Sequence, residues 1–459
     1  MKTMMQAAGL LGFLVMATGA KDGCGNAEVP TFVCVECDGL CEDGAGAATG
    51  GVGSGGAGAA TTGAGGNGGV PATVTPYYSR AYNLGQALQI GDLGLIDGDR
   101  HLVIRQDNAI VIIKVTKDGF TERARITDPD PSAGFQYWAP MLAVVPDVNG
   151  DNVNEIAAYA RDASGSLSRF YMLSGNLPVG AVNTGDKVAL YTLDFPSGDF
   201  LQVAVKPGGS EMVLSESAGF VRRRSTVDGK ILHTVNLAPA YYHGALSWVG
   251  DVNIDGVNDY AVASEEYGSN SQLYLISGVD TIDGSGLERA LFTLSEPSTL
   301  YLGYTSYNER NSNLVAAIGD ANGDGIVEIA VGAPYGNSGG RVVVFDGALG
   351  TAYGIINGYF PGSYGAFGSN VVAPGDMDGD QSADLVVSDP EDIAGGSGFG
   401  SISGYRGVDG TELFRYYADA GETLGDGGMI TIADLNGDGR PELAVGSSSN
   451  ASIWLSTSP

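Results

Sequence analysis

The sequence predicts an all-β fold, a seven-bladed β-propeller that an N-terminal strand closes into a ring. Three features predict this fold. A short apolar strand recurs seven times, each repeat has room for four strands, and the repeats show none of the sustained 3.6-residue periodicity that marks an amphipathic helix. Four strands in each of seven repeats describe a propeller. A linear solenoid is the alternative, but it would require distinct capping units at its ends.

Residues 1–20 are typical of a secretory signal peptide. Lys2 precedes an apolar run, Ala7–Ala17, that is too short to span a bilayer as a helix, and small residues follow it. A buried N-terminal helix is the alternative interpretation. We expect the mature protein to be secreted or tethered at the cell surface, without a transmembrane helix. A lipid anchor on Cys24 is not expected, because Lys21-Asp22-Gly23 stands where small and aliphatic residues would be needed.

A small cysteine-containing segment, residues 21–43, and a flexible linker, residues 44–71, come next. The segment holds all four cysteines of the chain: Cys24, Cys34, Cys37 and Cys41. In an exported protein they indicate two disulfides, with three pairings open, and a zinc knuckle is the alternative. The linker is rich in glycine and alanine, so it cannot bury an apolar surface and should stay flexible.

The propeller is expected to span residues 72–459. The residues that open the recurring strand are His101, Glu155, Glu211, Asp259, Glu328, Asp384 and Glu442. Their spacing of roughly 50–60 residues is close to that of propeller blades. In the fifth repeat, the four strands are predicted at Leu314–Gly319, Glu328–Ala333, Arg341–Phe345 and Tyr353–Gly358.

The two ends of this region predict how the ring closes. After Glu442 the last repeat has room only for its second and third strands, the latter at Ala451–Thr457. Ala72–Tyr78, ahead of the first repeat, is the predicted donor of the missing fourth strand. Closure of this kind removes the exposed sheet edges that favour aggregation.

Five of the seven repeats carry an acidic loop directly before the recurring strand. Each loop offers side-chain oxygens at positions 1, 3, 5 and 9 and a main-chain carbonyl at position 7. Counted in this order, the candidate metal ligands are Asp147, Asn149, Asp151, Val153 and Glu155; Asp251, Asn253, Asp255, Val257 and Asp259; Asp320, Asn322, Asp324, Ile326 and Glu328; Asp376, Asp378, Asp380, Ser382 and Asp384; and Asp434, Asn436, Asp438, Arg440 and Glu442. The other two repeats keep the strand and lack the loop.

An oxygen-rich set of this kind suits Ca²⁺, which takes six to eight oxygen ligands, and we expect about five ions. Mg²⁺ would demand stricter octahedral geometry. An EF-hand is excluded because position 12, Val331 in the fifth repeat, is an apolar strand residue and not the required acidic ligand. Plain Asx-turns without a metal are the alternative.

These repeats resemble the FG-GAP repeats of integrin α-subunit propellers and of bacterial relatives. The resemblance rests on the Gly-Asp-x-Asn-Gly-Asp-Gly loop that begins at Gly319, on Val331-Gly332-Ala333-Pro334 and on Phe367-Gly368. It covers roughly residues 72–459, although two repeats lack the ligands. The resemblance implies a seven-bladed propeller with calcium loops on one face and ligands bound on the opposite face. A given adhesion partner does not follow, because fold does not fix function.

The composition restricts the function. The net charge of −30 argues against a nucleic-acid partner, because binding the phosphate backbone needs a basic face. The chain has three histidines, which leaves few candidates for histidine-based catalysis. No metalloprotease, P-loop or redox motif is present. We therefore expect a non-enzymatic binding or adhesion module for an extracellular protein or glycan. A calcium-dependent polysaccharide-active enzyme, a lyase or hydrolase on a propeller scaffold, is the alternative.

Aromatic residues gather in the connections that lead into each first strand, opposite the acidic loops. Such rings suit the binding of a sugar or an arginine side chain. The candidate ligand-binding residues are Tyr242, Tyr304, Tyr364 and Tyr417. The alternative is that these tyrosines pack between blades.

Overall fold

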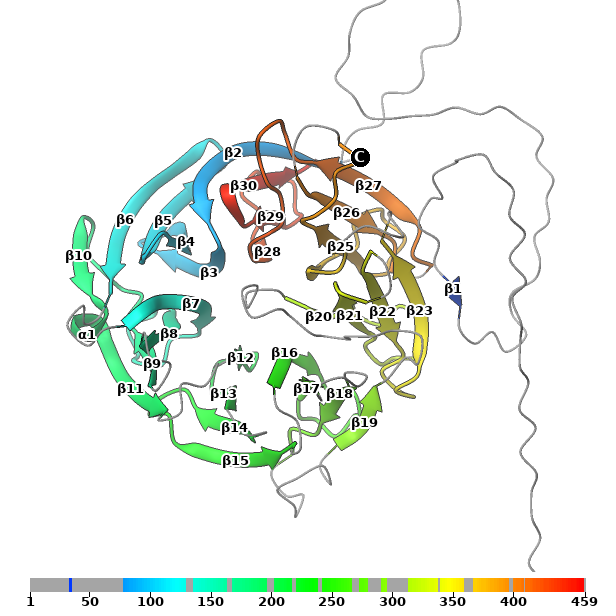
Figure 1. The fold of residues 1–459 in the computed structure, drawn as a ribbon, viewed down its shortest axis with the longest axis horizontal. Coiled ribbons are helices and arrows are strands. Elements are labelled where there is room, and N and C mark those ends of the chain that lie inside the picture. Colours follow the sequence, from blue (N-terminus) through cyan, green and yellow to red (C-terminus); the bar gives the residue numbers. More distant parts are fainter. Residues whose placement is uncertain are drawn as a thin grey trace, which may run out of the picture.

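Seven β-sheets stand around a central axis in the computed structural model, as the sequence predicts (Figure 1). The structure describes residues 33–34, 77–128, 135–162, 167–195, 202–216, 220–237, 242–265, 272–279, 290–294, 313–336, 339–358, 366–395, 399–407 and 409–457. The predicted signal peptide, the linker and most of the cysteine segment lie outside these residues, so the expectations for them stay predictions.

Each blade is an antiparallel sheet whose strands run outward from the axis in chain order, except that the N-terminal β2 is the outermost strand of blade seven. Blade one consists of β3 (Gln89–Ile96), β4 (Asp99–Gln106), β5 (Ala109–Thr116) and β6 (Gly119–Thr127). Blade two consists of β7 (Phe135–Val145), β8 (Glu155–Asp162), β9 (Ser168–Leu173) and β11 (Ala189–Phe195). Blade three consists of β12 (Gln202–Val205), β13 (Glu211–Glu216), β14 (Phe220–Ser225) and β15 (Ile231–Asn236).

The remaining blades repeat this order. Blade four holds β16 (Tyr242–Gly250), β17 (Asp259–Glu265), β18 (Gln272–Ile276) and β19 (Ala290–Leu294). Blade five holds β20 (Val315–Ala317), β21 (Ile329–Ala333), β22 (Arg341–Phe345) and β23 (Ala352–Asn357), close to the predicted ranges. Blade six holds β24 (Asn370–Gly375), β25 (Asp384–Asp389), β26 (Ser401–Tyr405) and β27 (Glu412–Tyr417), and blade seven holds β28 (Met429–Ile432), β29 (Glu442–Val445), β30 (Ser447–Ser456) and β2 (Tyr78–Ala87).

Three short elements lie outside this plan. β10 (Ala181–Thr184) adds a parallel strand to the outer edge of β6, and β1 (Val33–Cys34) pairs with β23. A single helical turn, α1 (Gly185–Val188), follows β10. In the part of the chain that the structure describes, no helix is long and apolar enough to cross a membrane.

An N-terminal strand closes the ring, but it is not the segment that the sequence suggested. The fourth strand of blade seven is β2, which pairs with β30 from Tyr78 opposite Ser456 to Ala87 opposite Ser447. Of the predicted donor, Ala72–Tyr78, residues 72–76 lie outside the described residues, and Tyr78 is the first residue of β2. The register shifts three times between Arg80 and Ala87, and these irregularities interrupt the alternation of apolar and polar residues that reveals a strand in a sequence.

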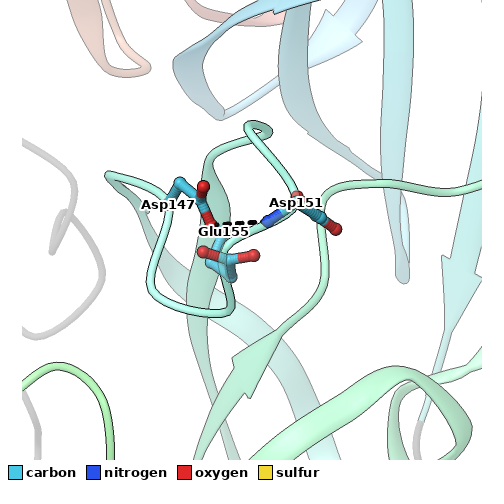
Figure 2. A group of neighbouring side chains, drawn as sticks. All are labelled: Asp147, Asp151 and Glu155. Atoms are coloured by element: carbon cyan, nitrogen blue, oxygen red, sulfur yellow. Dashed lines mark hydrogen bonds between the residues drawn. The ribbon is translucent and has the colours of Figure 1, made fainter.

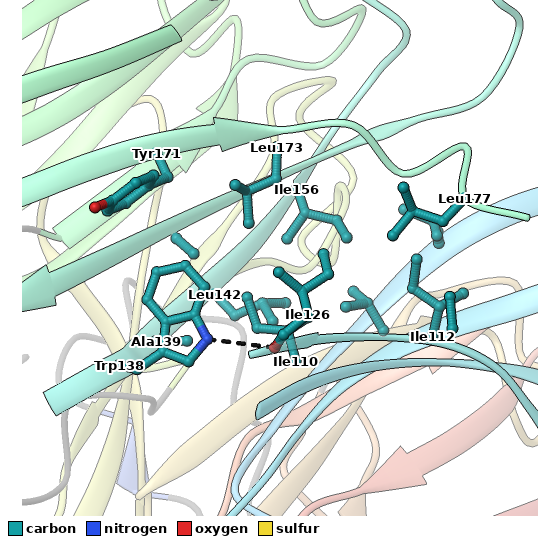
Figure 3. Packing of buried hydrophobic residues seen from close by; sticks show 14 of the residues in the cluster. Ile110, Ile112, Ile126, Trp138, Ala139, Leu142, Ile156, Tyr171, Leu173 and Leu177 are labelled. Atoms are coloured by element: carbon teal, nitrogen blue, oxygen red, sulfur yellow. Dashed lines mark hydrogen bonds between the residues drawn. The ribbon is translucent and has the colours of Figure 1, made fainter. Parts of the chain in front are cut away.

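The core consists of seven apolar clusters, one at each interface between neighbouring blades. Alternate residues of a strand face opposite sides of its sheet. Accordingly, Ile156 and Ala158 of β8 pack toward blade one, whereas Ala157 and Tyr159 pack toward blade three. Figure 3 shows the interface of blades one and two, where the buried Trp138 donates its indole N–H to the carbonyl of Ile126 at 3.4 Å. Because each sheet is buried on both sides, its middle strands read as continuous apolar runs.

The topology separates two faces of the ring. Every turn from the first to the second strand of a blade lies at one end of the sheets, which we call the acidic-loop face. The connections between blades and the turns from second to third strands lie at the other end, which we call the opposite face. All five acidic loops are therefore on one face, and they all precede a second strand.

Candidate metal sites

The five acidic loops share one backbone conformation. The residues at loop positions 4 and 6 have positive φ angles, between 58° and 90°, in every copy. These residues are Gly150 and Asn152, Ile254 and Gly256, Gly323 and Gly325, Gly379 and Gln381, and Gly437 and Gly439. Glycine adopts this conformation without strain, which explains its frequency in the loops.

The aspartate at position 1 organises each loop from within. Asp320 accepts the main-chain N–H groups of Gly323 at 2.6 Å and of Gly325 at 2.9 Å. Asp147, Asp376 and Asp434 accept the equivalent pairs, and Asp251 accepts those of Asp255 and Gly256. The position-3 side chain accepts the N–H of position 5, and the position-5 aspartate accepts the N–H of position 7. The main chain of each loop thus folds around the side-chain oxygens of the same loop.

The carboxylate at position 9 is buried in every loop and accepts the main-chain N–H of position 2. These acids are Glu155, Asp259, Glu328, Asp384 and Glu442. Burial raises the pKa of Glu155 and Glu328 to about 7, and that of Asp259 and Asp384 to about 6. It also raises the pKa of Glu442. A negative charge at this position is therefore costly unless a cation accompanies it.

Three of the five loops bring three carboxylates together. Within each trio, one oxygen from every acid lies within 4.8 Å of the others, close enough to share one cation. The trios are Asp147, Asp151 and Glu155 in blade two; Asp320, Asp324 and Glu328 in blade five; and Asp376, Asp378 and Asp384 in blade six. Figure 2 shows the blade-two trio, with Asp151 donating its main-chain N–H to Asp147 at 3.2 Å.

The side chain of Glu328 gives the clearest indication that a cation binds in one of these sites. Its side chain is fully buried and one oxygen, Oε2, accepts the N–H of Ala321 at 2.5 Å. Among the described residues, the other oxygen, Oε1, has no hydrogen-bond partner. A buried carboxylate oxygen without a partner carries a large desolvation penalty, which a coordinated cation would remove.

Among the residues that the structure describes, the acids of blades four and seven do not form such trios. In blade four, both oxygens of Asp259 accept main-chain N–H groups, from Val252 at 3.1 Å and from Gly278 at 2.9 Å. In blade seven, the hydroxyl of Ser456 donates to Asp438 at 3.0 Å, and its N–H donates to Glu442. The expected number of about five ions stays a prediction, since three loops converge and two do not.

Sequence reasoning missed a glycine that stands behind four of the loops. Gly175, Gly278, Gly347 and Gly407 each lie at the corner after the third strand of their blade. A Cβ atom there would come within 1.9–2.0 Å of the carbonyl oxygen at loop position 8. Only glycine lets the two main-chain segments come this close, so the corner packs directly against the acidic loop. The sequence does contain a sign of this packing, because a glycine recurs two residues after the third strand in these four blades.

The candidate ligand-binding tyrosines are only partly described. Tyr304 and Tyr364 lie outside the described residues, as does the side chain of Tyr242. Tyr242 begins β16 and Tyr417 ends β27, which places both on the opposite face. Tyr417 is 38% exposed. Their role in binding stays a prediction.

Comparison with known proteins finds similarity over part of the chain. The FG-GAP repeat family matches residues 313–345, from the start of blade five to the end of β22. Integrin alpha-IIb of Homo sapiens is 32% identical over 154 residues, which are 32% of this chain and 15% of that protein. The Mus musculus protein of the same name is 30% identical over 165 residues, with 34% and 15% covered. The chain therefore spans about 15% of the length of these two relatives.

A solved structure agrees on the architecture. Raptor of Chaetomium thermophilum superposes with a TM-score of 0.52 at 10% sequence identity, over 83% of this chain and 29% of that one. At this identity the likeness concerns the fold alone.

Proposed function

Starting from an integrin-alpha-like propeller that carries an FG-GAP repeat, we propose that the protein is an exported, calcium-stabilised binding module without enzymatic activity. The acidic-loop face holds the ions, and the opposite face binds an extracellular protein or glycan. The mature chain is secreted or tethered at the cell surface.

The calcium part of the proposal rests on the buried Oε1 of Glu328, which has no hydrogen-bond partner among the described residues. Two further acids of the same loop, Asp320 and Asp324, have an oxygen within 4.8 Å of an oxygen of Glu328. Oxygen-only ligand sets favour Ca²⁺ over transition metals. In a chain with a net charge of −30, ions in these loops would also relieve repulsion among the loop acids on one face.

The opposite face supports a macromolecular partner more than a small substrate. Among the described residues, a cavity of about 90 Å³ lies near the opposite face between the innermost strands, with Gln89, Gln202, Ser247 and Asn313 in its lining. Sites for small molecules typically measure ~300–1,000 Å³. This cavity is too small for such a molecule, and we therefore place the partner on the surface of this face.

Exposed apolar residues on the same face offer such a surface. Phe399 is 59% exposed and lies in the connection from β25 to β26, together with the exposed Ile393. Tyr417 stands at the end of the neighbouring β27. Exposed aromatic side chains are frequent hot spots of protein interfaces.

The test is an array of extracellular proteins and glycans probed with the purified protein in calcium and in chelator. Tyr242, Tyr304, Tyr364 and Tyr417 are then replaced singly by serine, as is Phe399. We expect selective loss of binding with unchanged melting. Phe120→Ser is the matched control, because Phe120 is also exposed but begins β6 near the acidic-loop face. Loss of melting temperature without selective loss of binding would make the tyrosines core residues and remove the proposed face. Turnover of an arrayed polysaccharide would favour an enzyme instead.

A further inference from the structure

Four blades have one corner residue next to the glycine that packs against the acidic loop. This corner residue directly precedes the corner glycine described above, and it is Ser174, Ser277, Asp346 or Arg406. In blades five and six the corner side chain contacts the loop itself, Asp346 at Asn322 and Arg406 at Asp378. The charge of these two corner residues therefore acts on any cation in the loop.

Arg406 points into the acidic set of blade six. Its Nε lies 2.8 Å from Oδ2 of Asp378 and 3.2 Å from Oδ2 of Asp380, which are loop positions 3 and 5. The Nη2 atom contacts the same oxygen of Asp378 at 2.5 Å. The other oxygen of Asp378 accepts the N–H of Asp380 at 3.1 Å. Both oxygens of the position-3 ligand are therefore already engaged.

Blade five has the opposite charge at the equivalent place. Asp346 accepts the side-chain amide of Asn322, the position-3 residue, at 3.3 Å. Here the corner adds a negative charge to the loop, and the fully buried Glu328 keeps one oxygen without a partner among the described residues. Two loops with the same backbone thus differ in the sign of the charge behind them.

The two blades without an acidic loop use protein cations at the same end of the sheet. In blade three, Arg223 is 1% exposed and its Nε lies 2.9 Å from Glu211, the residue that opens the second strand. In blade one, Lys114 lies 2.7 Å from Asp99, which opens β4. An arginine or lysine therefore serves as the counter-charge in three of the seven blades.

We propose that Arg406 is a built-in counter-cation of the blade-six loop, and that the corner residue sets the order in which the loops take up calcium. The blade-five loop, with Asp346 behind it, fills at low calcium. The blade-six loop fills only at higher calcium, because the ion must share or displace the guanidinium. This inference rests on the proposed calcium binding, and it names the residue that regulates one of the sites.

The experiment compares the full chain with Arg406→Ser, which carries the corner residue of blades two and four. Equilibrium dialysis counts the bound ions against free calcium. We expect Arg406→Ser to bind one ion at roughly tenfold lower calcium than the wild type, since a positive charge beside the site is gone. Asp346→Ser is the matched change in blade five, and it should move one ion to higher calcium. Adding Asp376→Ser to Arg406→Ser should abolish the gain, which assigns it to this loop.

A second measurement tests the counter-cation without calcium. In chelator, Arg406→Ser should melt at a lower temperature than the wild type, because Asp378 and Asp380 lose their partner, whereas Arg406→Lys should retain most of the stability. Millimolar calcium should restore the serine variant. If the wild type binds calcium and Arg406→Ser leaves the isotherm unchanged, the inference is wrong while the proposed function stands. If the wild type binds no calcium, the proposed function fails, and an unchanged melting temperature in chelator overturns the counter-cation as well.

Discussion

Glu328 reaches back across its own loop to accept the main-chain N–H of Ala321 at 2.5 Å, seven residues earlier in the chain. The contact fixes the second strand of blade five to the start of the loop that precedes it. The same link joins positions 9 and 2 in all five acidic loops. Each loop is thus a closed unit, in which the acid at or directly before the start of the second strand also lines the candidate metal site.

The blade-four loop contains a strained residue that can be relieved. Ile254 has a φ of 58°, a conformation that is costly for a β-branched side chain, and it is 73% exposed, so little packing depends on it. We expect Ile254→Gly to stabilise the protein by about 1 kcal/mol. Chemical denaturation measures the change. Ile393→Gly is the control, because Ile393 is also exposed but does not have a positive φ, and it should give no gain. A loss of stability in Ile254→Gly would show that the strain argument is wrong.

Asp389 predicts a pH dependence that does not involve the metal loops. Burial, and then the neighbouring Asp392, raise the pKa of Asp389 to about 7. The folded state therefore binds a proton more tightly than the unfolded chain, so this group's contribution to stability is present at low pH and is lost as the pH rises through about 7.

Asp389→Asn should remove that loss. The asparagine side-chain oxygen can still accept the N–H of Ala366, which now donates to Asp389 at 3.1 Å. We expect the variant to gain on the order of 1–2 kcal/mol at pH 8 relative to the wild type, with a smaller difference at pH 5. Urea unfolding in chelator at both pH values measures it. The exposed Asp118 provides the control Asp118→Asn, and equal pH profiles for wild type and Asp389→Asn would refute the assignment.

The closing strand β2 predicts which N-terminal deletions the propeller tolerates. Leu84 and Ala87 of this strand are buried in the cluster between blades seven and one, with Ile453. A chain that begins at Tyr77 should fold like the full protein, whereas one that begins at Leu88 should be strongly destabilised and associate through the free edge of β30. Urea unfolding and sedimentation compare the two. Equal stability would mean that the ring does not depend on β2.

The repeats made most of the fold predictable. The acidic loop marks the start of the second strand in five blades, and the spacing of those strands left room for four strands per blade. The closing strand was harder to place, because its bulges interrupt the two-residue alternation of apolar and polar side chains. The β-branched Thr-Val-Thr ahead of Pro76 resembles a strand more closely, so the prediction was placed there.

The positions of the five acidic loops were predictable from local spacing, since each loop is one continuous segment, but the differences between blades were not. That the residues at these positions bind a metal stays a prediction. The effect of Arg406 on Asp378 could not be foreseen, because the contact joins residues 28 positions apart and depends on how tightly the corner glycine packs. The contact between the hydroxyl of Ser456 and Asp438 was also not foreseen, because it joins residues 18 positions apart.

The most direct measurement of the central claim is a count of bound calcium by equilibrium dialysis for the wild type, Glu328→Gln and the control Glu122→Gln, together with melting in calcium and in chelator. Each ion at one hundred times its Kd should add about 2.7 kcal/mol to the stability of the wild type. We predict that Glu328→Gln binds one ion fewer and gains less from calcium, while Glu122→Gln, which changes an exposed glutamate of β6, matches the wild type. A wild type that binds no calcium, or a Glu328→Gln variant that binds as many ions as the wild type, would contradict the account.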